Sequence, residues 1–311
     1  MKRMSIGIVI SVHDGIVLAA DSASTLTLMA PTVPGQISQP QGPVAINVYN
    51  NANKIANLYK GKPIGCVAYG SGSIGSASIS TLLKDFREHL AEGAEKGFSI
   101  HSYTIEDVAK RLAVFLMAHA QRLAPNEPRP SIGIMVGGYS AGKNLGEAWL
   151  VPIENGVLRD LKPLRKEGDV GISWGGEGEV IARLVLGFSQ GLPNVLGSVI
   201  KPPPPAADLN KLMDLLRNTL QAPLAFAPMP IQDAIDLAEW LVHTAIMFSR
   251  FSPGAPSVGG PIESAAITKH EGFKWIHRKH YYDKDFNPEI RQYEHSARYD
   301  DIGKEPATSD A

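Results

Sequence analysis

Two short apolar runs at the start of the chain, joined by a turn, constrain the fold more than any other segment. Residues 5–12 read Ser-Ile-Gly-Ile-Val-Ile-Ser-Val, and residues 15–20 read Gly-Ile-Val-Leu-Ala-Ala. Because β-branched residues favour strands, we predict a strand from each run. The intervening His13-Asp14-Gly15 fits a three-residue loop with Gly15 in the left-handed conformation. The sequence therefore predicts that the chain begins with a β-hairpin.

The second run ends in an acid that returns toward the start of the chain. A three-residue loop places Gly7 opposite Asp21. Ser5 then lies diagonal to Asp21 on the same face of the sheet, because side chains alternate between faces along a strand. The hairpin is thus expected to bring a hydroxyl and a carboxylate close together.

A residue at the N-terminus of a chain can supply its own general base. A free α-amino group has a pKa of about 8, so near neutral pH part of it is uncharged and accepts a proton from an adjacent hydroxyl. The chain opens with Met1-Lys2-Arg3-Met4-Ser5. Removal of residues 1–4, or initiation at Met4 with loss of that methionine, would make Ser5 an N-terminal nucleophile.

A lysine opens a short segment after the turn at residues 50–53. Lys54 precedes Ile55 and the apolar residues that follow it. A lysine that enters a buried strand face requires an acid to pair with it, and Asp21 is the candidate. The alternative interpretation is a solvated lysine at the start of a strand.

These residues together resemble a known family. Ser5 followed by residues 14–22, Asp-Gly-Ile-Val-Leu-Ala-Ala-Asp-Ser, looks like the opening of proteasome β-type subunits, which are N-terminal nucleophile hydrolases. Residues 257–262, Ser-Val-Gly-Gly-Pro-Ile, look more like bacterial proteasome-related proteins than like the eukaryotic core particle. The resemblance covers roughly residues 5–276 and implies a four-layer α/β/β/α sandwich. The order of helices and strands alone indicates only the α+β class.

The resemblance implies roles for five residues. It implies that Ser5 attacks an amide carbonyl, that Lys54 tunes the Ser5 amine and hydroxyl, and that Asp21 keeps Lys54 charged and oriented. It implies that the Gly70 N–H receives the oxyanion. Ser252, after the last helix, stands for an accessory serine.

Two positions depart from the pattern of that family. Glu177 or Glu179 occupies the position of a second accessory serine, within a glycine loop that opens a helix. Ser249 stands where the family usually has an aspartate. These departures make a slow or inactive enzyme an alternative to an active one.

Two glycine-rich stretches mimic nucleotide-binding motifs. Residues 70–75, Gly-Ser-Gly-Ser-Ile-Gly, follow a strand, but the second strand ending in an acid about 20 residues later is missing. Residues 137–144 fit a P-loop until Asn144 replaces the hydroxyl residue that would hold Mg²⁺. We therefore predict no nucleotide, no other cofactor and no metal site.

Composition limits the partners. The net charge is −1 and the pI is about 6.8, which gives no field that favours nucleic acid or an anionic membrane. Cys66, the one cysteine, excludes an internal disulfide and is expected to be a small core residue. No apolar run reaches the roughly 18 residues that span a bilayer, and residues 1–4 lack the apolar core of a signal peptide. We expect a cytoplasmic protein.

Periodicity and turn residues divide the rest of the chain. We expect one domain over residues 5–282, with a candidate leader at 1–4, insertions near 29–43 and 189–230, and a disordered tail at 283–311. Helical spacing predicts helices over residues 76–90, 104–123, 179–188, 209–220 and 231–248. Apolar runs predict strands over residues 44–49, 63–69, 131–136, 262–268 and 273–276, and another from Glu147 to the Asn155-Gly156 turn.

The function implied by the resemblance is hydrolysis of amide bonds in a peptide or protein substrate. Two alternatives remain: a catalytically inactive structural subunit that keeps residues 1–4, and an amidase that acts on a small molecule in a closed pocket. The family also implies a homo-oligomer, either a ring or an open assembly.

Overall fold

Two antiparallel sheets form the centre of the structure. The first contains five strands in the order β13-β1-β2-β14-β15. Their bounds are β1 (Ile6–Val12), β2 (Gly15–Ala20), β13 (Gly171–Gly176), β14 (Glu263–Thr268) and β15 (Gly272–His277). The predicted hairpin therefore lies in the middle of this sheet, which explains why every residue of β1 and β2 is buried.

The second sheet has the order β11-β10-β9-β6-β5, and β12 pairs with β10. Its strands are β5 (Ile55–Asn57), β6 (Ile64–Gly70), β9 (Ile132–Gly138), β10 (Glu147–Glu154), β11 (Val157–Leu158) and β12 (Lys162–Arg165). Two separate hairpins are formed by β3 (Ser24–Leu28) with β4 (Val44–Tyr49), and by β7 (Ser73–Ile74) with β8 (Ala77–Ser78).

This computed structural model describes residues 5–28, 44–92, 98–202, 204–254 and 256–282. Contacts divide the chain into two units, Met1–Arg278 and Lys279–Ala311, and the helices and strands of the described residues belong to the first. The leader expected at residues 1–4, the insertion expected at 29–43 and the tail expected at 283–311 lie outside the described residues.

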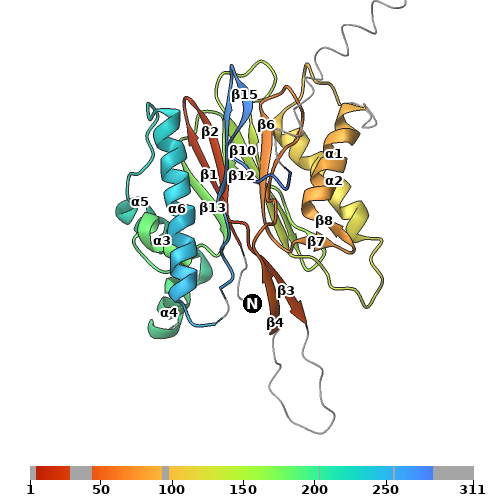
Figure 1. Cartoon of the computed structure of the whole chain (residues 1–311). Helices are drawn as coiled ribbons and strands as arrows, with labels where there is room; N and C mark the ends of the chain where they lie inside the picture. The colour runs from red at the N-terminus through yellow and green to blue at the C-terminus, as the bar shows by residue number, and fades with distance from the viewer. Residues whose placement is uncertain (1–4, 29–43, 93–97, 203, 255, 283–311) are drawn as a thin grey trace, which may run out of the picture. The chain divides into compact units, whose positions relative to one another are not determined.

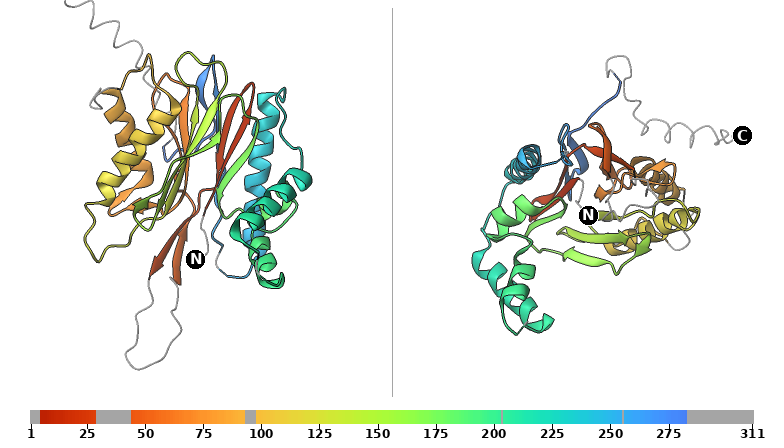
Figure 2. Two further views of the ribbon diagram at one scale, coloured as in Figure 1. Left: turned by 180° about the vertical axis from the view of Figure 1, so that it is seen from behind. Right: turned by 90° about the horizontal axis from the view of Figure 1, so that it is seen from below.

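Helices cover the outer faces of both sheets (Figures 1 and 2). The sheet that contains β6 is covered by α1 (Ile79–Ala91) and α2 (Ile105–Ala120). The sheet that contains β1 is covered by α3 (Glu179–Leu186) and α6 (Ile231–Phe251). Of two further helices, α5 (Ala206–Leu220) packs against α3, and α4 (Leu192–Val199) packs against α5.

Three apolar clusters hold these layers together. One lies between α1, α2 and the second sheet, and another lies between α3, α6 and the first sheet. The third fills the space between the two sheets. Strand β1 contributes to two of them, because Ile8 and Ile10 face the helices whereas Val9 faces the other sheet. The α+β class predicted from the sequence is confirmed.

The register of the first hairpin differs from the prediction. Val12 pairs with Gly15 and Gly7 pairs with Ala20, so the loop contains two residues and Asp21 follows the last strand pair. Gly15 does not have a positive φ angle. A Cβ at Gly15 would lie 2.8 Å from the Ile267 carbonyl oxygen, so glycine is required there for close packing.

Most predicted helices and strands are present with shifted ends. The Thr104 hydroxyl caps α2 by accepting a hydrogen bond from the Asp107 N–H at 3.0 Å. Asn155 and Gly156 both have positive φ and form the turn between β10 and β11. The prediction missed β3 and α4, and it took the strand β13 for part of a glycine loop.

The two nucleotide-binding mimics have other structures. Residues 70–75 lead into the β7–β8 hairpin, not directly into a helix. Residues 137–144 form the end of β9 and an exposed turn, in which Lys143 pairs with Glu167 at 2.9 Å. Cys66 is fully buried in β6, and this burial raises the pKa of its thiol to about 12. Its expected place in the core is confirmed.

Two residues of α2 test the assigned core. Leu112 is fully buried, whereas Val114 is 67% exposed on the same helix. We expect Leu112→Ala to lower the free energy of unfolding by about 2–5 kcal/mol, because it leaves a cavity under the helix. Val114→Ala is the matched control and should change it by less than about 0.5 kcal/mol. Urea unfolding measures both, and equal effects would contradict this packing.

Candidate active site

A buried carboxylate at the end of β2 organises the candidate site. Asp21 is fully buried and has hydrogen-bond donors at both oxygens. Its Oδ1 accepts from Lys54 Nζ at 2.5 Å and from the Ile6 N–H at 2.9 Å. Its Oδ2 accepts from the N–H groups of Ala23 at 3.1 Å and Gly259 at 3.0 Å. Four donors and no acceptor suit an ionised carboxylate, which only accepts hydrogen bonds.

Lys54 lies directly before β5 and is 7% exposed. Its backbone is fixed on both sides, since its carbonyl accepts from the Ala68 N–H at 2.8 Å and its N–H donates to Glu263 at 3.4 Å. Its ammonium group pairs with Asp21. Lys54 is therefore a buried ion-pair partner, not a solvated lysine at a strand start.

Ser5 lies immediately before Ile6, whose N–H donates to the same Asp21 oxygen as Lys54. Its N–H donates to the Ser257 carbonyl at 3.1 Å, and its carbonyl accepts from the Glu177 N–H at 2.8 Å. The side chain is 3% exposed. A Cβ at Gly176 would lie 2.0 Å from the Ser5 carbonyl oxygen, so this close approach requires glycine. Two loops and the end of β13 thus fix Ser5 beside the ion pair.

The backbone of Ser5 is strained. Its φ angle is +87°, and Ser5 and Asn155 are the residues other than glycine with positive φ in the described part of the chain. Asn155 lies in a turn, where asparagine tolerates this conformation. A serine with positive φ outside a turn is strained by roughly 1–3 kcal/mol, and such strain clusters at functional sites.

Ser249 at the end of α6 and Ser257 in the following loop connect this helix to the site. The Ser249 hydroxyl accepts from the N–H groups of Ser257 at 3.1 Å and Val258 at 3.4 Å, which fixes the loop against the end of the helix. The Ser257 carbonyl then binds the Ser5 N–H. The Ser257 hydroxyl is buried and has no hydrogen-bond partner among the described residues. This unpartnered hydroxyl belongs to the residue whose carbonyl binds the Ser5 N–H.

Two residues expected at the site are held elsewhere. The Ser252 hydroxyl donates to the Phe248 carbonyl at 2.7 Å at the exposed end of α6. Glu179 pairs with Arg183 at 2.7 Å, on the side of α3 that meets residue 190. Glu177, in contrast, contacts Ser5 directly through its backbone N–H. The structure therefore does not bring Ser252 or Glu179 to Ser5.

Gly70 lies at the end of β6, two residues after Ala68, whose N–H donates to the Lys54 carbonyl. Its φ is +97°, and a Cβ there would lie 2.3 Å from the Ser131 carbonyl oxygen. Glycine is thus required at this position for backbone reasons alone. Its role as oxyanion donor stays a prediction.

The roles of three residues that build the site were not predicted from the sequence. Ser257, Gly259 and Glu263 come from one loop and the strand after it, and Ser249 had been noted only as a departure. The Ser-Val-Gly-Gly segment at 257–260 was the available signal. The sequence pattern pointed instead to Ser252, which directly follows the last helix, whereas Ser257 lies five residues further along the chain.

The described residues contain no group of three or more His, Cys, Asp or Glu side chains that could hold a metal ion. Among the helices of the described ranges, none is long and apolar enough to cross a membrane.

Comparisons with known proteins give no family. No family model matches the chain, and no curated protein matches it. A solved structure described as the helical assembly of the Anbu complex from Pseudomonas aeruginosa is similar over 98% of this chain and 98% of that chain, with 16% identity and a TM-score of 0.46. A similarity this distant carries no argument about fold or function.

The resemblance to proteasome β-type subunits is therefore corrected. Membership of that family, and of its bacterial relatives, is wrong on these comparisons, since no family model matches and the structural similarity is distant. The α+β class holds, whereas the four-layer sandwich of N-terminal nucleophile hydrolases is not confirmed.

Asp21 and Lys54 should contribute unequally to the free energy of unfolding. We expect Asp21→Asn to lower the free energy of unfolding by about 3–5 kcal/mol, because Lys54 then lies buried without a counter-charge. Lys54→Met should cost less, about 1–3 kcal/mol, because Asp21 keeps three backbone donors. Urea unfolding distinguishes them.

The exposed pair between Arg159 and Glu154, at 3.0 Å, provides the control for these variants. Arg159→Met should change the free energy of unfolding by less than about 1 kcal/mol. A larger loss from Lys54→Met than from Asp21→Asn would contradict the central position assigned to Asp21.

Ser249, at the end of α6, and Ser257, in the loop after it, should differ in their contribution to stability. Ser249→Ala removes the acceptor of two buried N–H groups and should cost about 1–3 kcal/mol of unfolding free energy. Ser257→Ala removes a hydroxyl that has no partner and should be neutral or stabilising. Thermal unfolding of both variants tests this, and a large loss for Ser257→Ala would show that its hydroxyl has a structural partner.

Proposed function

We propose that this protein hydrolyses amide bonds with Ser5 as its nucleophile, after removal of residues 1–4. One observation carries the proposal: Ser5 adjoins the buried Asp21–Lys54 ion pair, and Ile6, the next residue, donates to the same carboxylate oxygen as Lys54. A buried ion pair is costly to form and stabilises a fold less than apolar packing would. Its position beside a strained serine supports a catalytic role.

The reaction would begin with attack of Ser5 Oγ on the carbonyl carbon of the amide. The free α-amino group of Ser5, or a water bound to it, takes the hydroxyl proton and delivers it to the departing amine. This leaves an ester between Ser5 and the acyl group of the substrate. Attack of water on that ester releases the acid and restores the Ser5 hydroxyl.

The ion pair would tune this base. The positive charge of Lys54 lowers the pKa of a neighbouring amine, because a second positive charge nearby is unfavourable. Asp21 fixes the ammonium group of Lys54 at 2.5 Å and keeps it from turning toward solvent. Both residues act through Ser5 and are positioning residues in this scheme.

The conformation of Ser5 supports removal of the preceding residues. The angle φ of Ser5 exists only while its nitrogen is bonded to the carbonyl carbon of residue 4. Cleavage of that bond removes the torsional constraint that holds φ at +87°, and the strain of roughly 1–3 kcal/mol would be released. The folded chain therefore favours the cleaved product at this position.

The Ser257 hydroxyl is our candidate contact for the free amine. The Ser5 nitrogen already lies 3.1 Å from the carbonyl oxygen of Ser257, whose hydroxyl has no partner among the described residues. We assign to Ser257 the accessory position that the sequence had suggested for Ser252. The Gly70 N–H remains the candidate oxyanion donor, and a peptide or protein remains the proposed substrate class.

The proposal predicts which serine is essential. Protein made from the full coding sequence is assayed against a library of fluorogenic peptide amides. We expect Ser5→Ala to reduce kcat/KM at least about 1,000-fold, because the nucleophile is lost. Ser5→Thr, which keeps a hydroxyl, should retain activity.

Ser252→Ala serves as the matched control and should leave kcat/KM within about twofold of the parent. Ser257→Ala should lower kcat and shift its pH profile, with KM unchanged, since it acts on the amine. Activity that survives Ser5→Ala would contradict the proposal. Absence of activity in the parent protein, with residues 1–4 still present, would favour the inactive structural alternative.

A further inference from the structure

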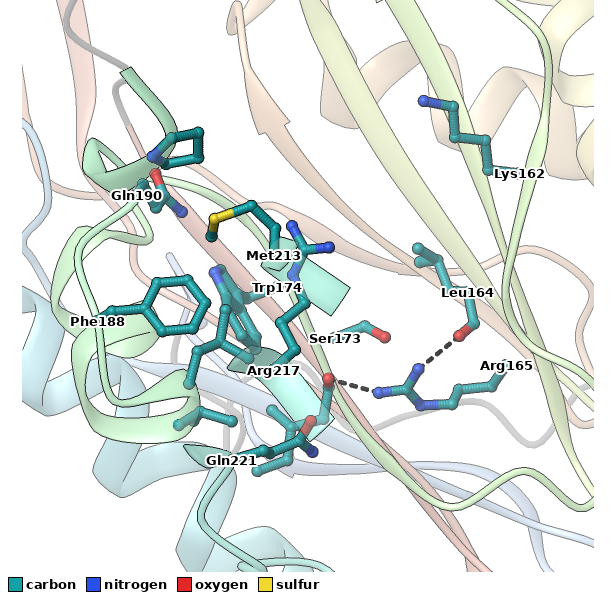
Figure 3. A pocket seen from close by; sticks show the side chains of 14 residues that line it. Lys162, Leu164, Arg165, Ser173, Trp174, Phe188, Gln190, Met213, Arg217 and Gln221 are labelled. Atoms are coloured by element: carbon teal, nitrogen blue, oxygen red, sulfur yellow. Dashed lines mark hydrogen bonds between the residues drawn. The ribbon is translucent and has the colours of Figure 1, made fainter. Parts of the chain in front are cut away.

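A cavity that does not include Ser5 lies beside β13, an edge strand of the first sheet. It has a volume of about 800 Å³ and is lined by residues of β12, β13, α3 and α5 and by the segments that adjoin α4 (Figure 3). Two features distinguish its lining from an ordinary apolar gap. It contains three cationic side chains, Lys162, Arg165 and Arg217, and it contains no carboxylate.

Backbone carbonyls, and not an ion pair, hold the guanidinium of Arg165. Its guanidinium donates to two backbone carbonyls, those of Leu164 at 2.7 Å and Ile172 at 2.6 Å, and no described residue forms an ion pair with it. Its Nε is buried without a partner among the described residues. Burial lowers the pKa of this guanidinium, although Asp169 opposes the effect. Burial of a guanidinium is unfavourable, so an anion bound in the cavity would stabilise the charge of Arg165.

Arg217 supplies a second cation from the opposite wall. It extends from α5 and has one ion pair, with the exposed Asp214 at 2.8 Å, which leaves donors of its guanidinium available. In Figure 3 its guanidinium lies near Met213 and points away from the guanidinium of Arg165. The guanidinium of Arg217 can bind a carboxylate through two parallel hydrogen bonds, and the positive charge of Arg165 on the same cavity adds to the attraction.

The remaining lining is mostly apolar and aromatic. Trp174 and Phe188 lie on the side of Arg217 in Figure 3, together with Met213. Neutral hydrogen-bonding side chains are supplied by Gln190 and Gln221. A volume of this size and a lining with few polar groups are typical of pockets for small organic molecules. The cations define the charge of the ligand, and the aromatic wall defines its body.

We propose that this cavity binds an organic anion, an apolar or aromatic body that carries one carboxylate. The carboxylate would bind the guanidinium of Arg217, in a cavity that Arg165 and Lys162 also make positive, and the body would lie against Trp174 and Phe188. The site is independent of Ser5, because Ser5, Asp21 and Lys54 are not among the residues that line the cavity. It therefore stands whether or not Ser5 is catalytic.

A matched pair of probes tests the charge requirement. Binding of 1-pyrenebutyrate and of its neutral amide is measured by fluorescence anisotropy with the full-length protein. We expect the carboxylate to bind at least about 10-fold more tightly than the amide. Equal affinities would overturn the proposal, because they would show that the arginines do not contribute.

Variants locate the site. Arg217→Gln should remove most of the difference between the two probes, whereas Arg159→Gln, which loses the same charge outside the cavity, should retain it. Arg217 is exposed, so circular dichroism should show a folded variant; Trp174→Phe should reduce energy transfer from tryptophan to the pyrene. Ser5→Ala should bind both probes as the parent does. Loss of binding in Ser5→Ala, or an unchanged difference in Arg217→Gln, would overturn the assignment.

Discussion

One buried carboxylate joins segments of the chain that are far apart in sequence. Asp21 accepts hydrogen bonds from the start of β1, from Lys54 before β5, from the turn after β2 and from the loop after α6. These contacts connect the first sheet with the second and with the loop that holds the Ser5 nitrogen. Because burial of this charge is costly unless every donor is in place, the position of Ser5 depends on the whole arrangement.

Local patterns in the sequence predicted much of this arrangement. The apolar runs of β1 and β2 and the acid that follows them indicated the hairpin, and the cost of burying Lys54 indicated its pairing with Asp21. The register was wrong because the packing of Gly15 against β14 cannot be read from the hairpin alone. Helix α4 was missed because it contains Pro193 and Gly197 and buries none of its residues.

The residues of the loop after α6 could not be identified in the same way. Their role depends on contacts between positions that are eight or more residues apart, such as the bond from the Ser257 N–H to Ser249. Spacing along the chain therefore pointed to Ser252, whose hydroxyl only caps its own helix. The cavity with Arg165 and Arg217 has the same origin, since β12 and α5 meet only in the folded chain.

The central claim is that the folded chain exposes Ser5 as its N-terminus. The most direct test is the intact mass, with N-terminal sequencing, of protein made from the full coding sequence and kept folded for hours after purification. The account predicts a chain that begins at Ser5. Retention of residues 1–4 in a Ser5→Ala chain would show in addition that the serine assists the cleavage. A parent chain that retains Met1–Met4 and shows no amide hydrolysis would contradict it.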